Sequence, residues 1–105
     1  MKSVSLIRNK EFGIQERSPF AWVASLFFKG RPTAMVIGKT IHLSGVSSPD
    51  FLQDQRWVLH ELEHIRQFKQ YGFYNFLFLY LLESLKNGYY NNRFEIEARK
   101  AENFS

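Results

Sequence analysis

The feature that most constrains this chain is the run His60-Glu61-Leu62-Glu63-His64, which lies inside a long amphipathic stretch. Two histidines four residues apart on a helix project from one face about 6 Å apart, so both imidazoles can reach a single tetrahedral ion. Glu61 is rotated by about 100° from His60, which places its carboxylate beside that ion, where it can act on a bound water. The motif therefore predicts a helix, a zinc site and a general base, Glu61.

The composition favours one folded domain around this helix. A chain of 105 residues with 45% hydrophobic and 17% aromatic residues can fill one core, so we expect residues 1–105 to form a single domain. The chain has no cysteine, which excludes disulfide scaffolds and thiolate zinc sites. Any metal must therefore be bound by histidine and carboxylate.

The charge pattern and the apolar runs limit which partners and which cellular location we expect. The net charge is +4, and the 14 lysines and arginines are spread without a basic block, so nucleic-acid binding is not required. The N-terminus lacks the apolar run of a signal peptide, and no stretch approaches roughly 18 apolar residues, so we expect a cytoplasmic protein without a membrane span. We interpret the short apolar run Phe76–Leu82 as a buried helix, the alternative being a membrane-surface or partner-binding face.

Start and stop signals predict four helices. Ser-Pro pairs at 18–19 and 48–49, with glycines at 30 and 72, predict helices over residues 19–29 and 49–71. Asn-Gly at 87–88 ends a mostly apolar helix over 74–86, which should back the metal helix, and Asn91-Asn92 can cap a last helix from 93 to about 103. Residues 1–17 show no helical period and are expected to be irregular or a short strand.

An alternating, β-branched stretch over residues 34–43 predicts a hairpin. Gly38-Lys39 fits a two-residue turn with glycine first, which pairs Val36 with Ile41 and Ala34 with Leu43. His42 points to the other face, either as a half-exposed strand residue or as a polar group lining the cleft near the metal. The predicted fold class is therefore α+β, mainly helical, with a small hairpin or sheet.

The third zinc ligand must come from elsewhere in the chain, because a catalytic zinc has three protein ligands and an open position. His60-Glu61-x-x-His64, followed by a helix with Glu95-Ile96-Glu97-Ala98, resembles the gluzincin metallopeptidases, in particular their minimal single-domain bacterial forms. In that clan a glutamate on a later helix, often in a Glu-x-x-Ala pattern, is the third ligand. The resemblance implies a zincin-like fold with Glu95 as ligand, and it covers about residues 33–103.

Two other glutamates remain candidates for the third ligand. Glu83 lies 19 residues after His64, a spacing used by some gluzincin aminopeptidases, and Glu97 follows Glu95 by two residues. Two residues on a helix differ in direction by about 200°, so Glu95 and Glu97 cannot both face one ion.

One position departs from the clan. Its members often carry an acid four residues after the ligand glutamate to hold the first histidine, and this chain has Arg99 there. The outer N–H groups of the histidines then need other acceptors: a backbone carbonyl, Asp54 or Gln67.

The resemblance implies a small zinc-dependent metallopeptidase, a hydrolase acting on a peptide or protein substrate. Glu61 would accept the proton of a zinc-bound water as it attacks the peptide carbonyl, and would pass that proton to the leaving amine. An extended substrate could add to the hairpin edge by main-chain pairing. The side chains that could supply a second donor to the oxyanion are Tyr89, Tyr90, His42 and Arg93.

The alternative function is a non-catalytic zinc-binding regulatory or protein-interaction module. The small size favours it, because 105 residues leave little chain to build a deep cleft. The presence of Glu61 favours catalysis, since a structural zinc gains nothing from a base and is usually closed by four ligands.

Overall fold

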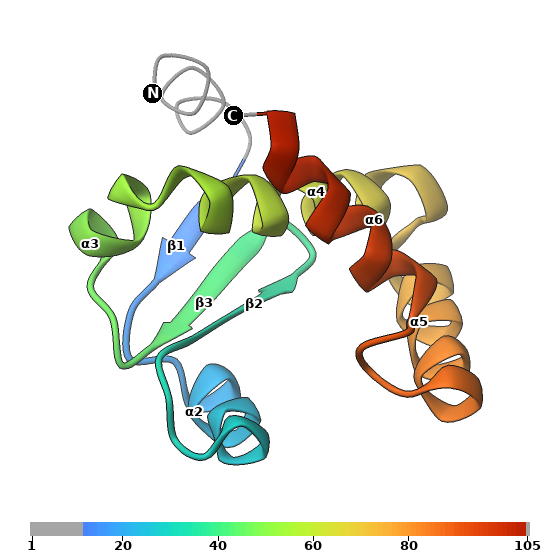
Figure 1. The fold of residues 1–105 in the computed structure, drawn as a ribbon, viewed down its shortest axis with the longest axis horizontal. Coiled ribbons are helices and arrows are strands. Elements are labelled where there is room, and N and C mark those ends of the chain that lie inside the picture. Colours follow the sequence, from blue (N-terminus) through green and yellow to red (C-terminus); the bar gives the residue numbers. More distant parts are fainter. Residues whose placement is uncertain (1–11, 105) are drawn as a thin grey trace.

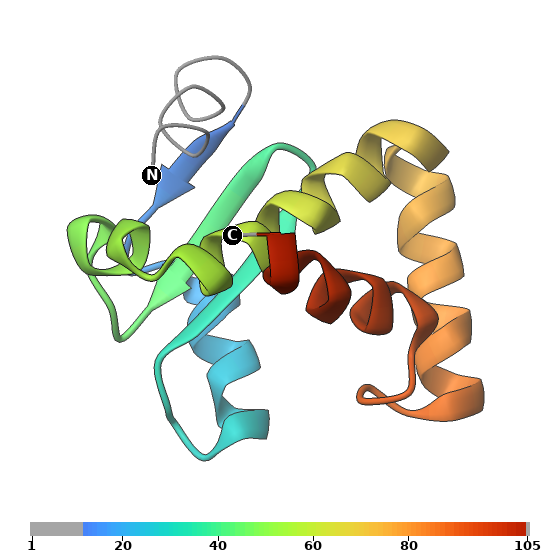
Figure 2. The same ribbon diagram turned by 45° about the horizontal axis from the view of Figure 1, so that its top comes forward.

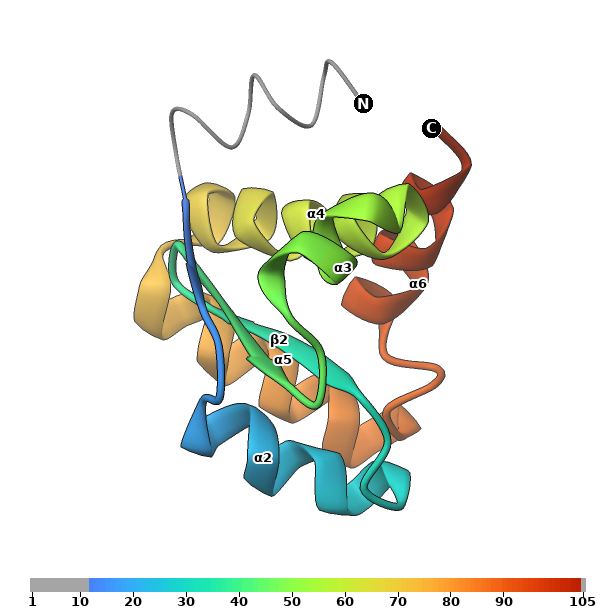
Figure 3. The same cartoon turned by 90° about the vertical axis from the view of Figure 1, so that its left-hand side faces the viewer.

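The computed structural model describes residues 12–104, which form a mainly helical α+β fold around a small sheet (Figure 1). The strands are β1 (Gly13–Gln15), β2 (Thr33–Ile37) and β3 (Thr40–Ser44), in the order β1-β3-β2. One face of the sheet is covered by α2 (Pro19–Ser25) and the short 3-10 helix η1 (Leu26–Phe28), and the other by α3 (Ser48–Gln53) and α4 (Gln55–Tyr71), as Figure 3 shows. The predicted fold class is confirmed at this level.

Three further elements lie beyond the sheet: α5 (Phe73–Asn87), α6 (Arg93–Ala101) and the 3-10 helix η2 (Glu102–Phe104). Figure 2 shows α6 running alongside α4, with α5 at the far end of both. Gly72 makes the sharp turn from α4 into α5 at a φ of 85° and a ψ of 156°, a conformation that only glycine adopts readily. The central helix α4 therefore has the sheet on one side and two helices on the other.

The predicted hairpin is confirmed in its register. Val36 pairs with Ile41 and Ala34 with Leu43, and the turn residue Gly38 has a φ of 65°. The short strand that was one expectation for residues 1–17 is present as β1, which pairs with β3 in parallel; residues 1–11 lie outside the described part. Because β3 is central, β2 is an edge strand within residues 12–104.

The predicted helix over residues 19–29 is shorter than expected. Ser18 caps it as predicted, accepting hydrogen bonds from the backbone N–H groups of Phe20 and Ala21. The regular helix ends at Ser25, tightens into η1, and stops at Lys29, which has a φ of 60°.

The single helix predicted over residues 49–71 is wrong, because the chain breaks at Asp54 into α3 and α4. Asp54 has a φ of −90° and a ψ of 89°, and its carboxylate accepts a hydrogen bond of 3.1 Å from the Trp57 N–H. An internal aspartate thus caps a second helix start, which competes with continuation of the first helix.

The interpretation of Phe76–Leu82 as a buried helix is also wrong. Only Phe76 of α5 is buried; with Tyr80 it packs against Phe68 of α4 and Phe94 of α6, and so backs the metal helix as predicted. The opposite side of α5 carries large apolar side chains into solvent. Among residues 12–104, no helix is both long and apolar enough to cross a membrane.

Two hydrophobic clusters hold α4 in place. Its Val58 and Ile65 pack on Ile41 and Leu43 of the sheet, and its Phe68 packs in the cluster with α5 and α6. Burial of several such side chains at about 1.5–3 kcal/mol each fixes the rotation of α4 about its axis. That rotation directs His60 and His64 towards α6.

Candidate metal centre

The site is built where α4 faces α6. Glu95 of α6 places one carboxylate oxygen, Oε1, 3.0 Å from Nε2 of His60 and 3.2 Å from Nε2 of His64. One donor atom from each of the three residues lies within 4.8 Å of the others. His64 and Glu95 are buried and His60 is partly so. The three side chains converge on one point, as a single metal ion requires.

The other nitrogen of each imidazole is held by an acceptor. Nδ1 of His60 lies 2.8 Å from Oε2 of Glu102, and Nδ1 of His64 lies 2.9 Å from Oε1 of Gln67. Gln67 is fully buried and donates its amide N–H to the Phe94 carbonyl at 3.1 Å, which fixes the amide orientation. Each Nδ1 can donate its hydrogen to the acceptor beside it, which directs Nε2 of each ring at Glu95.

The arrangement fits a divalent cation better than it fits protons. If Nδ1 of each ring keeps its hydrogen, a hydrogen bond from Nε2 to Glu95 requires a second hydrogen on that ring. Both imidazoles would then be positively charged, with ring centroids only 5.1 Å apart. Although burial opposes it, the hydrogen bond to Glu95 raises the pKa of His64 to about 9, and the pKa of His60 is raised in the same way. One metal ion can replace both Nε2 protons and relieve that repulsion. The residues present therefore fit a metal.

Glu95 is prepared to act as an anionic ligand. Burial acts against its charge, but hydrogen bonds from His60 and His64 hold its pKa below the usual range. Its second oxygen, Oε2, accepts a hydrogen bond from the Tyr80 hydroxyl. Burial and the nearby carboxylate raise the pKa of Tyr80, so it stays a donor. Tyr80 thereby leaves one oxygen of Glu95 to face the histidines.

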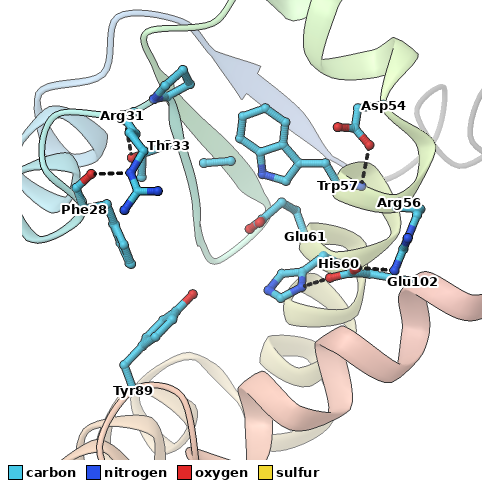
Figure 4. A pocket seen from close by; sticks show the side chains of 12 residues that line it. Phe28, Arg31, Thr33, Asp54, Arg56, Trp57, His60, Glu61, Tyr89 and Glu102 are labelled. Atoms are coloured by element: carbon cyan, nitrogen blue, oxygen red, sulfur yellow. Dashed lines mark hydrogen bonds and ion pairs between the residues drawn. The ribbon is translucent and has the colours of Figure 1, made fainter.

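Glu61 lies on α4 beside the two histidines and is 4% exposed. Burial raises its pKa to about 7, and the charges of His64 and His60 oppose that shift. Its carboxylate faces a pocket of about 600 Å³, which Figure 4 shows between β2, α4 and the loop that carries Tyr89. A carboxyl group with a pKa near 7 can both accept and return a proton at neutral pH.

The structure leaves both rival glutamates outside the cluster. Glu83 accepts hydrogen bonds from the Arg93 N–H and the Asn87 amide, at 3.2 Å each, and so caps the start of α6. Glu97 also faces α4, but its carboxylate accepts a hydrogen bond of 3.0 Å from Gln67 and is not among the converging ligand atoms. The three residues brought together are His60, His64 and Glu95.

The acceptors for the histidines were only partly anticipated. Gln67 was among the expected residues, whereas Asp54 caps α4 instead. Glu102 was missed, although it follows Glu95 by seven residues, two helical turns along the same face. Tyr80 was missed because nothing in the sequence of an apolar helix distinguishes a tyrosine that donates to a ligand from one that only packs. Arg99, which stands where an acid was expected, donates to the Tyr90 carbonyl and stacks on that ring.

Of the four expected oxyanion donors, Tyr89 lines the pocket (Figure 4). Tyr90 is engaged by Arg99, and Arg93 lies over the Phe94 ring at 4.6 Å. Both interpretations of His42 are wrong: it is only 7% exposed and does not line the cleft. Its Nδ1 lies 2.8 Å from Oγ of Ser18, because α2 covers the sheet face opposite α4.

Comparisons of the chain with protein-family models, with curated proteins and with solved structures find no match. The chemistry of the site therefore rests on its geometry.

Proposed function

We propose that this protein is a zinc-dependent peptidase with a zincin-like, gluzincin-type site, in which His60, His64 and Glu95 bind the metal and Glu61 is the general base. The observation that carries the proposal is the convergence of two imidazole Nε2 atoms on one carboxylate oxygen, beside a buried glutamate that faces a pocket. A purely structural metal site would have no use for that glutamate.

The donor set supports zinc as the metal. Two imidazole nitrogens and one carboxylate oxygen, with no thiolate available, form a three-ligand set of the kind found at catalytic zinc. When bound, zinc would polarise the substrate carbonyl and acidify a water at its open position.

Glu61 moves the proton in the proposed reaction. Its carboxylate takes a proton from the attacking water, whose oxygen forms the new bond to the carbonyl carbon. The same carboxyl group then returns the proton to the leaving nitrogen as the C–N bond breaks. Burial raises the pKa of Glu61 above that of an exposed glutamate, which favours its role as a proton acceptor.

The walls of the pocket supply contacts for a peptide. Thr33 and Ala34, at the start of the edge strand β2, line the same pocket as Glu61, so an extended peptide can pair with that edge while its carbonyl reaches the site. Tyr89 faces the pocket from the other side (Figure 4), where its hydroxyl can donate to the developing oxyanion. Partial burial and the nearby carboxylates of Glu95 and Glu61 raise the pKa of Tyr89, which keeps it a donor.

The test compares wild type with Glu61→Gln on a peptide library. Glutamine is nearly isosteric, so fold and zinc content should be unchanged, but a neutral amide cannot accept the proton. We expect the cleavage rate to fall by roughly 10² to 10⁴.

Equal cleavage by both proteins would rule out Glu61 as the base. If zinc is bound in both and neither cleaves any peptide, the non-catalytic zinc-binding module becomes the better account of the site. The open pocket of about 600 Å³ would then be a binding surface for a partner segment.

A further inference from the structure

Helix α5 carries its apolar stripe on the side that faces away from the protein. Five large apolar side chains share one face at spacings of three and four, and Tyr74 and Leu85 are 82% and 81% exposed. The inward face packs Phe76 and Tyr80 against α4 and α6, and its Tyr80, Glu83 and Ser84 make hydrogen bonds to α6 and its N-terminal cap. Helix α5 thus exposes more large apolar side chains than it buries, the reverse of a surface helix in a self-contained domain. The outward stripe is Tyr74, Leu77, Phe78, Leu81 and Leu85.

The segment α2–η1 shows the same reversal. It packs on the sheet through the small residues Ala21 and Ser25, which are buried. Its large side chains point outward, and Phe27 is 85% exposed. The exposed set is Phe20, Trp22, Val23, Leu26 and Phe27.

The large hydrophobic side chains that are exposed in the described chain are concentrated in α2–η1 and in α5 with the turn that follows it. Among residues 12–103, whose side chains the structure describes, every large hydrophobic side chain that is exposed lies in residues 20–27 or 73–90. Figure 3 shows α2–η1 across the sheet from α3 and α4, and Figure 1 shows α5 at the side of the molecule, next to α6. The two segments meet where Phe28 packs edge-on against Tyr89 at 5.5 Å between ring centroids. Patches of this extent mark an interaction surface.

The charge around α2–η1 indicates what that surface meets. Residues 17–49 contain two arginines and two lysines and no acidic residue. Arg17 lies at one end of α2–η1, and Lys29 and Arg31 at the other; all three are exposed. Exposed aromatic and leucine side chains flanked by basic residues match the interface of a bilayer that contains anionic lipid.

We propose that α2–η1 and α5 dock together on the surface of an anionic lipid bilayer without crossing it. With 15 residues, α5 is about 22 Å long, less than the roughly 30 Å of a hydrocarbon core. A second copy of this chain is a poorer occupant, since a self-complementary contact through α2–η1 would bring these basic residues of both copies together.

The docking would place the candidate site at a membrane surface. Phe28, at the end of η1, and Tyr89, after α5, both line the pocket that holds Glu61. A peptide close to the bilayer would then reach the pocket. The docking itself does not rest on the proposed function, because neither segment contains a residue of the metal site.

The experiment is co-sedimentation of the full chain with vesicles of phosphatidylcholine alone and of phosphatidylcholine mixed with phosphatidylglycerol. We expect binding to the mixed vesicles, weaker binding to phosphatidylcholine alone, and loss of affinity as salt is added. Glu61→Gln should bind vesicles like wild type. The vesicle-binding result can therefore be interpreted even if the protein proves not to be a peptidase.

Two kinds of variant separate the apolar and the basic contributions. Leu81→Gln with Leu85→Gln should weaken vesicle binding by roughly ten-fold or more, because both side chains are exposed and would insert. Lys29→Asn should weaken it about five-fold, asparagine being compatible with the positive φ there. The matched control is Lys100→Gln, an exposed lysine on α6, which should bind like wild type. A second apolar pair, Leu26→Gln with Phe27→Gln, stands in if the α5 variant does not fold.

Light scattering in the absence of lipid completes the test. A wild-type dimer that Leu81→Gln with Leu85→Gln dissociates, without vesicle binding, would assign the apolar faces to a second copy and overturn the proposal. A monomer that binds neither type of vesicle would overturn the bilayer proposal and would assign the apolar faces to a protein partner. Vesicle binding that is unchanged in both apolar pairs would also contradict it.

Discussion

The nitrogen that each histidine presents to Glu95 is set by the hydrogen bond at its other nitrogen. Glu102 holds Nδ1 of His60, and Gln67 holds Nδ1 of His64, while Gln67 is itself oriented by the Phe94 carbonyl. Such outer contacts fix the tautomer and orientation of a metal ligand. At the scale of single residues, the site thus depends on side chains that touch no metal.

Glu102→Ala should lower zinc affinity by about 10- to 100-fold, because His60 loses the acceptor that holds its ring and its Nδ1 hydrogen. Chelator competition measures the change. Glu63→Ala is the control: it removes a carboxylate that pairs with Arg66 on α4 and should leave affinity close to wild type. Equal losses in the two variants would show that Glu102 has no specific role.

His42 gives a pH dependence of stability that is independent of the metal centre. Burial lowers its pKa from 6.5, so the folded state holds it neutral where the unfolded chain binds a proton. Its contribution to stability is complete above about pH 6.5 and is lost as the pH falls towards the lowered folded pKa. Urea unfolding of wild type and His42→Gln across pH 7 to 5 should show a steeper acid loss in wild type; parallel curves would contradict the assignment.

At the scale of elements, several boundaries could be read from the sequence and others could not. The hairpin register and the cap of α2 by Ser18 follow from local residues, and both are confirmed. The break at Asp54 was missed, because an aspartate inside an amphipathic stretch is also compatible with a continuous helix. The direction of α5 was missed because an apolar run indicates a hydrophobic face and not what covers it.

The turn between α4 and α5 depends on Gly72. A Cβ there would meet nothing within 4 Å, so the cost of Gly72→Ala is backbone strain alone, at its φ of 85°. We expect a loss of about 1–3 kcal/mol in the free energy of unfolding, measured by denaturant titration. Gly13→Ala is the comparison, since Gly13 has no positive φ and a Cβ there would lie 3.9 Å from Thr40. Equal effects of the two substitutions would refute strain at Gly72.

At the scale of the whole molecule, the motif at residues 60–64 predicted the helix on which the site is built, and the later Glu-x-x-Ala pattern pointed to Glu95. The structure brings His60, His64 and Glu95 together from two helices, α4 and α6, and Glu95 follows His64 by about thirty residues in the sequence. Glu102 and Tyr80 could not be ranked in advance, because their roles depend on how α5 and α6 pack on α4. The exposed apolar faces of α2–η1 and α5 likewise could not be predicted, because which face of a helix is exposed depends on how that helix packs in the fold.

The measurement that tests the account most directly is the zinc content of purified protein after equilibrium dialysis, compared among wild type, Glu95→Ala and Glu97→Ala. The two glutamates lie on the same helix, but only Glu95 faces the histidines. We predict one zinc per chain in wild type, retention in Glu97→Ala and loss in Glu95→Ala. Stoichiometric zinc in Glu95→Ala, or none in wild type, would contradict the site described here.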